Sequence, residues 1–302
     1  MNTQTDISIA LATRNRAASL ARLFDGLAAQ ANAPPFEVII GDNGSSDDTI
    51  DVIERVRDRL QIRYVYEERP GKSRALNNAL KLAQSELIVF TDDDVQPYPN
   101  WIAQLYAASI IYSDCNVFGG QIEVNLEAVP RWIKRSHNLM ALLTATHRYG
   151  DSDTRYSYGQ YPFGPNMAIR HHLLTGLDSP YPEHLGPGTR MLVGDEHTFL
   201  SQFSPPNATD RIFVANARVM HEVESESVNF NGALNRCYLA GRTYGMLGIP
   251  YTAQDINSPV STLTLILQRM RSCQSLRELI CISARYIGYL QGYHMNRQKG
   301  GN

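Results

Sequence analysis

The sequence is poor in cysteine and contains no long hydrophobic run. Its 302 residues include four cysteines, and none of these belongs to a CxxC pair or to a Cys/His spacing suited to zinc. A disulfide framework and a structural zinc module are therefore not expected. The apolar stretches, such as ELIVF and LTLIL, fall far short of the roughly 20 residues that cross a bilayer.

The N-terminus also lacks the features of a signal peptide, since MNTQTDISIALATRNR leads straight into a strand-like run. We expect residence in the cytoplasm, with peripheral contact with the inner face of the membrane left open. An excess of charge of one sign is missing as well, because 28 Lys and Arg stand against 30 Asp and Glu, for a net charge of −2. This balance is typical of ordinary globular proteins and argues against nucleic acid as a partner.

The first third of the chain alternates short β-branched runs with helical patterns. The predicted strands are residues 7–12, 36–41, 62–67 and 87–91, and the predicted helices between them are residues 16–30, 47–60 and 72–84. Such alternation is typical of βαβ units, so we expect an α/β fold with a mostly parallel, twisted sheet flanked by helices.

The rest of the chain is less regular. The patterns predict strands at 116–124 and 211–219, helices at 130–143, 166–174 and 195–203, and a loop region rich in Tyr, Gly and Asp at 146–165. Helical patterns dominate from about residue 229 onward. Residues 251–302 carry six Lys or Arg against two Asp or Glu, which indicates a basic helical extension.

Polar residues follow three of the early strands at the point where each strand ends. Thr13 to Arg16 follow the first, Asp42 begins the loop after the second, and Asp92 to Asp94 follow the fourth. Ligands of an open parallel sheet bind outside the carboxyl ends of its strands. These three strand ends should therefore meet in one crevice.

Three consecutive aspartates after an apolar strand indicate a site for a divalent cation. Carboxylates so close together raise one another's pKa unless a positive charge lies nearby, and Mg²⁺ and Mn²⁺ prefer carboxylate oxygens. Asp92 and Asp94 point to the same side of an extended backbone, which leaves Asp93 for a ribose or a second role. The alternative is a cluster that caps a helix.

Two further segments offer groups for an anionic or nucleotide ligand. Asp42 in DNGSSDDT can accept hydrogen bonds from a base or ribose, although by itself it also fits a simple Asx turn. Lys72 and Arg74 in RPGKSRALN stand at a predicted helix N-terminus, which suits an anion, but they could equally be solvated charges. This is not a Walker A motif, because GxxxxGK[ST] is absent.

Several short motifs, taken together and in order, resemble those of family 2 glycosyltransferases, which have the GT-A fold. The segments that carry the resemblance are Asn15 after the first strand, EVIIGDNGSSDDT, PGKSRALNNAL, ELIVFTDDDVQPYPNWI, FGPNMAIR and VGDEHTF. They span residues 7 to about 199, with a weaker continuation at VMHEV.

The resemblance implies roles for individual residues. Asp42 matches the aspartate that binds the nucleotide base, and Asp92 and Asp94 match the DxD pair that holds ribose and the diphosphate-bound Mn²⁺ or Mg²⁺. His221 matches a histidine that completes the metal site in many relatives, although a buried, hydrogen-bonded histidine is as good a reading. The further nucleotide- and donor-binding residues are Thr13, Asn15, Lys72, Arg74, Asn77, Asp93, Gly164 and Asn166.

The same resemblance points to the catalytic carboxylate. Glu196 stands where the family has the catalytic aspartate of a Glu-Asp pair, but the order here is Asp195-Glu196. We therefore favour Glu196 as the base that deprotonates the acceptor and keep Asp195 as the alternative. A turn at Gly164-Pro165-Asn166, ahead of a predicted helix, would shape the donor sugar pocket unless it is merely structural.

These parts imply an inverting transfer of a sugar from a nucleoside-diphosphate donor to an acceptor hydroxyl. A metal ion and nearby cations would stabilise the leaving diphosphate, and one general base would suffice. Uridine diphosphate donors are the commonest in the family, so we expect a UDP-sugar, with a glycan, a lipid-linked or a small-molecule acceptor. The QxxRW signature of processive synthases is missing, which favours single addition, and ALN in place of ARN puts Leu76 where many relatives have arginine.

The resemblance also suggests a domain division. We expect a catalytic domain over residues 1–228, with a nucleotide-binding half at 1–115 and an acceptor-binding half at 116–228, followed by an extension at 229–302. The apolar and basic residues of 261–293 in that extension fit an interfacial helix on anionic lipid, but packing on the catalytic domain or in a homodimer is the stronger expectation.

Two rival functions remain. A sugar-phosphate nucleotidyltransferase would also use an α/β sheet and a divalent metal, but it would carry a glycine-rich basic loop after the first strand, where this chain has no glycine before Gly26. A non-catalytic protein that binds nucleotide-sugars is the other alternative, and the intact TDDDV and GDEH segments argue against it.

Overall fold

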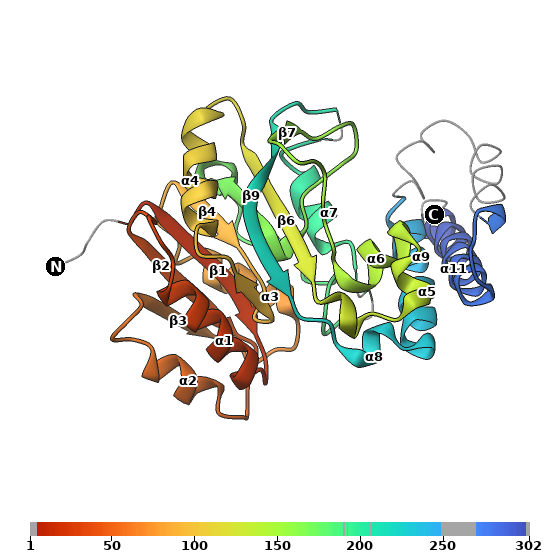
Figure 1. Cartoon of the computed structure of the whole chain (residues 1–302), viewed down its shortest axis with the longest axis horizontal. Helices are drawn as coiled ribbons and strands as arrows, with labels where there is room; N and C mark the ends of the chain where they lie inside the picture. Colours follow the sequence, from red (N-terminus) through yellow and green to blue (C-terminus); the bar gives the residue numbers. More distant parts are fainter. Residues whose placement is uncertain (1–4, 190, 192, 206, 249–269, 300–302) are drawn as a thin grey trace. The chain divides into compact units, whose positions relative to one another are not determined.

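The computed structural model describes residues 5–189, 191, 193–205, 207–248 and 270–299. Figure 1 shows helices packed on a mixed β-sheet. The strands are β1 Ile7–Thr13, β2 Phe36–Asp42, β3 Ile62–Tyr66, β4 Leu87–Phe90, β5 Val95–Pro97, β6 Val117–Val124, β7 Thr154–Arg155, β8 Met167–Arg170 and β9 Arg211–His221. The α-helices are α1 Ala17–Ala28, α2 Thr49–Arg55, α3 Lys72–Leu80, α4 Trp101–Ile111, α5 Arg131–Lys134, α6 His137–Thr144, α7 Asp195–Ser201, α8 Ser225–Val228, α9 Phe230–Leu247 and α11 Leu276–Lys299. Short 3₁₀ turns are η1 Leu126–Ala128, η2 Gly164–Asn166 and η3 His171–Leu174.

The sheet has the strand order β3-β2-β1-β4-β8-β6-β9-β5, with β7 paired to β9. The parallel part consists of β1 to β4, in which β1 pairs with β2 and β4, and β2 pairs with β3. The pairs β4–β8, β6–β8, β5–β9 and β7–β9 are antiparallel. The predicted mostly parallel arrangement therefore holds for the first four strands, and the sheet as a whole is mixed.

Two buried cores cover the two faces of this sheet. Side chains of β1 alternate between them, so that Ile9 packs with α1 and α4 while Ala10 packs with α3 and α7. All seven residues of β1 are buried, as expected for a central parallel strand with helices on both faces. This packing holds the carboxyl ends of β1, β2 and β4 at one edge.

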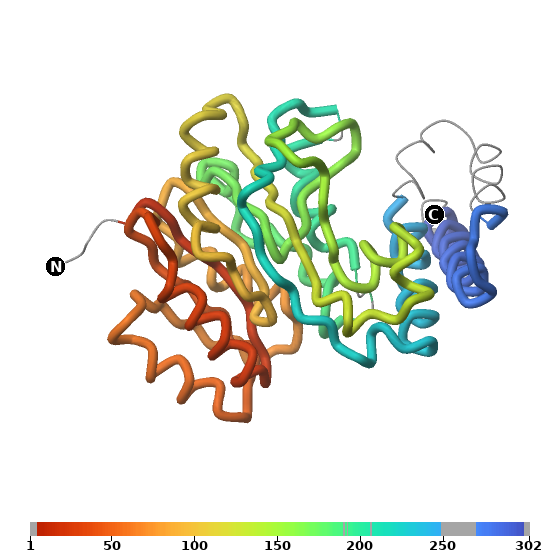
Figure 2. Tube along the Cα trace, viewed as in Figure 1, coloured from red at the N-terminus to blue at the C-terminus, as the bar shows by residue number. Residues whose placement is uncertain are grey.

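Figure 2 shows β6 and β9 side by side, although they lie about 90 residues apart in the sequence. Strand β9 then pairs with the short strand β5, which directly follows the aspartate run. In this register Val95 lies opposite His221. The end of β9 is thereby fixed next to Asp94, 127 residues earlier in the chain.

Three elements differ from the predictions. Residues 166–174 were predicted as a helix, but Met167–Arg170 form strand β8 against β4, flanked by 3₁₀ turns. A short apolar run does not distinguish a buried strand from a helix, and here the buried pairing with β4 decides. The predicted helix at 130–143 is two helices, because Ser136 caps α6 through its side chain. Helix α4 was not predicted.

The described residues fall into two compact units. The first contains those of Met1–Glu123, His147–Thr189 and Asp195–Glu222, and the second those of Val124–Thr146, Arg190–Gly194 and Val223–Asn302. The second unit therefore takes in α5 and α6, which the sequence placed in a domain ending at residue 228. The division of the catalytic domain into a nucleotide-binding half at 1–115 and an acceptor-binding half at 116–228 stays a prediction.

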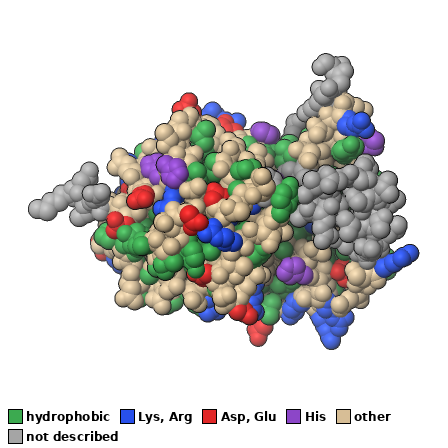
Figure 3. Space-filling model, turned by 90° about the horizontal axis from the view of Figure 1, so that it is seen from above, with side chains coloured by type: hydrophobic (Ala, Val, Ile, Leu, Met, Phe, Trp, Pro, Cys, Tyr) green, Lys and Arg blue, Asp and Glu red, His purple; other side chains and the backbone are tan. Residues whose placement is uncertain are grey.

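The second unit has its own core, built around α9, α5 and α6. Cys237 and Cys281 belong to that core, and all four cysteines of the chain are free thiols, as expected. Among the described residues, none of the helices combines the length and the apolar character needed to cross a membrane. Charged side chains of both signs are interspersed over the face drawn in Figure 3.

Candidate active site

The aspartate run after β4 and the end of β9 form one cluster in the first unit. Ligand atoms of Asp92, Asp94 and His221 all lie within 4.8 Å of one another. The backbone fixes this arrangement, because β5 pairs with β9 and the N–H of Glu222 donates to the carbonyl of Asp94 at 2.9 Å. The sequence prediction that these three residues come together is thus consistent with the structure, and the cluster could hold a metal ion.

Two buried polar atoms of the cluster have no hydrogen-bond partner, which is consistent with a cation-binding site. The buried Oδ1 of Asp94 makes no hydrogen bond, and its contact with Nε2 of His221, 3.3 Å away, is only an ion-pair approach. Nδ1 of His221 is also buried without a hydrogen-bond partner. Two carboxylates and an imidazole are a donor set that Mn²⁺ accepts readily.

The charges around Asp94 favour its ionised form. Burial alone would raise its pKa, but the close contact with His221 and the positive charges of His221, Arg16 and Lys72 lower it overall. Nη1 of Arg16 lies 3.4 Å from Oδ2 of Asp94. For His221, burial lowers the pKa, and the contact with Asp94 more than offsets this and raises it.

The side chain of Asp93 has a partner within the protein. Its side chain is buried and accepts a hydrogen bond of 2.6 Å from the hydroxyl of Thr13. Burial raises the pKa of Asp93 to about 6, although the Thr13 hydroxyl works in the opposite direction. The side chains of Thr13 and Asp93 thus hold β1 to the aspartate run, and the role of Asp93 toward a ribose stays a prediction.

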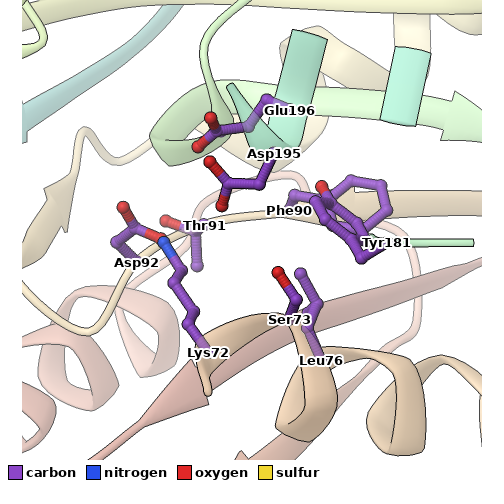
Figure 4. Close-up of a pocket in the computed structure, with 10 residues that line it drawn as sticks. Lys72, Ser73, Leu76, Phe90, Thr91, Asp92, Tyr181, Asp195 and Glu196 are labelled. Atoms are coloured by element: carbon purple, nitrogen blue, oxygen red, sulfur yellow. The ribbon is translucent and has the colours of Figure 1, made fainter. Parts of the chain in front are cut away.

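A pocket beside this cluster brings together α3, α7 and the end of β4 (Figure 4). Nζ of Lys72, at the start of α3, lies 2.5 Å from Oδ1 of Asp92. The carboxylates of Asp195 and Glu196 lie next to each other at the start of α7. The lining residues are Lys72, Ser73, Leu76, Phe90, Thr91, Asp92, Gly164, Tyr181, Asp195 and Glu196.

Burial and neighbouring charges shift the pKa values of Glu196 and Lys72. Burial and the neighbouring Asp195 raise the pKa of Glu196 to about 8. Burial would lower the pKa of Lys72, but the carboxylates of Asp92, Glu196 and Asp195 raise it well above its ordinary value. Lys72 therefore stays charged, while Glu196 can hold or release a proton near neutral pH, which is what a general base requires.

Two glycines make room for these carboxylates. A Cβ on Gly164 would lie 2.6 Å from Oε1 of Glu196, and a Cβ on Gly186 would lie 2.5 Å from Oδ2 of Asp195. Gly186 also has a φ of +87°, which side chains rarely adopt. Gly164 was predicted to shape the donor pocket, which stays a prediction; it lines the pocket of Figure 4 and precedes a strand, not the helix that was expected.

Asp42 and Asn15 tie together the ends of β1 and β2. Asp42 is buried and accepts hydrogen bonds from the N–H of Ser45 and the hydroxyl of Tyr64, both at 2.9 Å. Asn15, with a φ of +52°, accepts from the N–H of Ser46 at 2.7 Å. These hydrogen bonds link the ends of β1 and β2, and the predicted crevice at this edge stays a prediction.

Three other predicted residues have protein partners. Arg74 forms an ion pair of 2.7 Å with Glu183. Asn77 and Asn166 both lie in the interior with their amides hydrogen-bonded to protein, and their roles in donor binding stay predictions. Asn77 bonds the backbone of Tyr181, and Asn166 bonds the indole of Trp101 and the carbonyls of Gln121 and Ala217.

Sequence reasoning missed the segment that closes the pocket over the start of α3. The carbonyl of Pro187 accepts from the N–H of Lys72, and the carbonyl of Leu185 accepts from the hydroxyl of Ser73, each at 3.1 Å. Tyr181 stacks on Phe199 with ring centroids 4.0 Å apart. The clustered Gly and Pro of YPEHLGPGT were the available signal for an ordered loop.

Residues 8–175 match the sequence model of a family described as "Glycosyl transferase family 2". Over 105 residues the chain is 39% identical to a validoxylamine A glucosyltransferase from Streptomyces hygroscopicus subsp. limoneus. That alignment takes in 34% of this chain and 23% of the relative, so the match covers about a quarter of the relative's length.

Solved structures with the GT-A fold resemble the whole architecture. Staphylococcus aureus TarS 1-349 in complex with UDP matches at a TM-score of 0.52 and 17% identity, covering 97% of this chain and 92% of that one. A mannosyltransferase from Pyrobaculum calidifontis in complex with GDP-Man and Mn²⁺ matches at 0.56 and 16%, covering 96% and 88%. At these identities the likeness shows the fold, which agrees with the predicted fold class.

Proposed function

The chain belongs to glycosyl transferase family 2, and from that premise we propose that it moves a sugar from a nucleoside-diphosphate donor to an acceptor hydroxyl, with inversion at the anomeric carbon. The observation that carries the proposal is that two sets of site residues lie side by side in the first unit. A metal-competent cluster, Asp92, Asp94 and His221, lies beside a pocket that holds Lys72 and the pair Asp195 and Glu196. A single displacement needs these two parts and no protein nucleophile.

In this proposal Asp92, Asp94 and His221 would hold Mn²⁺ or Mg²⁺. When bound, the ion would supply positive charge to the diphosphate on which negative charge develops. Lys72, which already faces three carboxylates, lies where it can add a second positive charge to the leaving group. Asp42 and Asn15, at the ends of β2 and β1, would bind the nucleoside.

Glu196 is the proposed general base. Its pKa of about 8 allows it to take the proton of an acceptor hydroxyl at neutral to alkaline pH. Asp195 lies beside it, raises its proton affinity and is the alternative base. Gly164 and Gly186 leave both carboxylates the space to approach a substrate.

The donor is proposed to be a UDP-sugar. TarS 1-349, which matches this fold, has been solved with UDP and with UDP-GlcNAc, while the matching mannosyltransferase was solved with GDP-Man. The acceptor is proposed to belong to polysaccharide, lipid-linked glycan or other glycoconjugate synthesis, with single additions, because QxxRW is absent from the sequence. We place the protein in the cytoplasm, and its C-terminal helices offer a surface for a membrane or for a second copy.

Each of the two rival functions would give a result that the proposed function would not. A nucleotidyltransferase would release pyrophosphate from a nucleoside triphosphate and a sugar phosphate, whereas the proposed enzyme would not. A non-catalytic binding protein would bind UDP-sugars without releasing UDP.

The direct test is UDP release from a panel of UDP-sugars, with water or added glycans as acceptors. Glu196→Gln should lower turnover by about 10² to 10⁴-fold, because it removes the base, while it leaves UDP affinity within about twofold. Asp58→Asn, which changes an exposed carboxylate, is the matched control and should behave as the wild type. Unchanged turnover in Glu196→Gln would move the base to another residue.

A further inference from the structure

Helices α9 and α11 of the second unit pack against each other through glycines on both helices. A Cβ on Gly241 of α9 would lie 1.8 Å from the carbonyl oxygen of Arg285, and one on Gly288 of α11 would lie 2.2 Å from that of Tyr238. Gly245 and Gly292 make equally close approaches one turn further along each helix. Backbones this close fix which face of α11 points toward α9.

The outer face of α11 carries an apolar stripe. Leu276, Ile280, Ile287 and Leu290 are between 37% and 71% exposed. Their spacings of four, seven and three residues keep all four side chains on one side of a helix. Ile282, which lies in the predicted interfacial segment 261–293, is buried instead. Residues 261–269 of the predicted interfacial segment lie outside the described residues.

The charges beside this stripe have one sign. Arg277 follows Leu276 directly, Arg297 lies seven residues beyond Leu290 on the same side, and both are exposed. The acidic residue of α11, Glu278, is buried and accepts a hydrogen bond from the N–H of Gln274. Within the described residues 270–299 the stripe is therefore flanked by cations and by no exposed carboxylate.

We propose that this stripe is a membrane-contact surface that lies on an anionic lipid bilayer. The apolar side chains would enter the boundary between headgroups and acyl chains, and Arg277 and Arg297 would pair with lipid phosphates. Charge complementarity favours lipid over a second copy. Parallel pairing of two such faces would bring Arg277 next to its own copy, and antiparallel pairing would offer Arg277 and Arg297 no exposed carboxylate of residues 270–299 in the other chain.

The experiment is co-sedimentation of the full chain with vesicles of phosphatidylcholine alone or with roughly one third phosphatidylglycerol. The wild type should sediment with the anionic vesicles and stay in the supernatant with the neutral ones. Raising NaCl from roughly 0.05 to 0.5 M should release it, because salt screens the arginine contacts. Ile287→Gln combined with Leu290→Gln should weaken the partition about tenfold or more.

Two further variants separate the contributions. Arg277→Gln and Arg297→Gln should each weaken binding to anionic vesicles about fivefold. Ile110→Gln combined with Ile111→Gln is the matched control, since these α4 side chains are 63% and 69% exposed but have no place in the stripe. That control should bind as the wild type does.

Other results would overturn the proposal. Wild-type binding by the Ile287→Gln and Leu290→Gln variant would show that another surface meets the lipid. A dimer in sedimentation velocity without lipid, dissolved by the same two substitutions, would assign the stripe to a second copy. Binding that appears only after deletion of residues 249–269 would assign the stripe to that segment of the chain. None of these results depends on sugar transfer.

Discussion

Glu196 shows at the scale of one residue how the site departs from ordinary surface chemistry. A carboxylate normally ionises near pH 4.5, but burial and the adjacent Asp195 raise the pKa of Glu196 to about 8. The native state therefore holds this proton more tightly than the unfolded chain does. Ionising Glu196 therefore costs free energy in the folded protein, as is usual for a carboxylate placed in a closed pocket.

This yields a stability prediction. Between about pH 4.5 and pH 8 the folded state binds more protons at Glu196 than the unfolded state, so the free energy of unfolding contributed by this group falls as pH rises. Glu196→Gln removes the ionisation and should be more stable than the wild type at pH 8.5, by roughly 1–3 kcal/mol, and little different at pH 4.5. Urea unfolding with EDTA present at the two pH values measures this.

The control for that comparison is again Asp58→Asn, whose exposed carboxylate should give no such pH-dependent difference. Equal unfolding free energies of Glu196→Gln and wild type at both pH values would contradict the raised pKa. The same ionisation should make turnover of the wild type rise with pH up to about 8.

Some residues could be predicted from the sequence and others could not. Asp92 and Asp94 were found because a run of carboxylates after an apolar strand is unfavourable unless a cation lies close to it. His221 was found only through the family resemblance, since the β5–β9 register that places it is not visible in the sequence. The buried hydrogen bonds of Asn77 and Asn166 could not be predicted, because amides that bind ligands and amides that satisfy buried backbone look alike in a sequence.

At the scale of elements, the turn η2 lies directly against the side chain of Glu196, the proposed base. Gly164 is buried in η2, and a Cβ there would lie 2.6 Å from Oε1 of Glu196. Its φ is not in the left-handed region, so alanine is acceptable to the backbone at this position. The glycine is therefore required by the approach of the Glu196 side chain and not by the turn.

We predict that Gly164→Ala displaces the Glu196 carboxylate and lowers kcat by about 10 to 100-fold, because small misplacements of a base are costly. The melting temperature should change little, since the side chain that must move is flexible. Gly150→Ala, whose Cβ would have no neighbour closer than 3.4 Å, is the matched control. A Gly164→Ala enzyme with wild-type kcat would show that Glu196 does not need its present position.

The predicted elements match the structure where the sequence pattern and the tertiary packing favour the same conformation. The first four strands are short apolar runs between helical patterns, and each was predicted within a residue or two. The failures, at 166–174 and 130–143, lie where the antiparallel part of the sheet and a serine cap decide the conformation. Strand β8 depends on its pairing with the distant strand β4, which a local pattern cannot reveal, whereas the Ser136 cap is a local contact with the N–H of Leu139.

At the scale of the whole molecule, the site lies entirely within the first unit. The division of the chain into interleaved units was not predicted, because it depends on which of the segments 124–146 and 223–248 pack together. The alternation of strand and helix patterns predicted the fold class correctly, since the family match and the mixed sheet agree with the predicted α/β fold.

The central claim is that carboxylates behind β4 bind a divalent cation together with a nucleoside diphosphate. Isothermal titration of UDP into the wild type, Asp94→Ala and Asp58→Asn, each with Mn²⁺ or with EDTA, tests it most directly. Mn²⁺ should strengthen UDP binding at least about tenfold in the wild type and in Asp58→Asn, and should give no such gain in Asp94→Ala. Equal UDP affinity in all proteins with and without Mn²⁺ would contradict it.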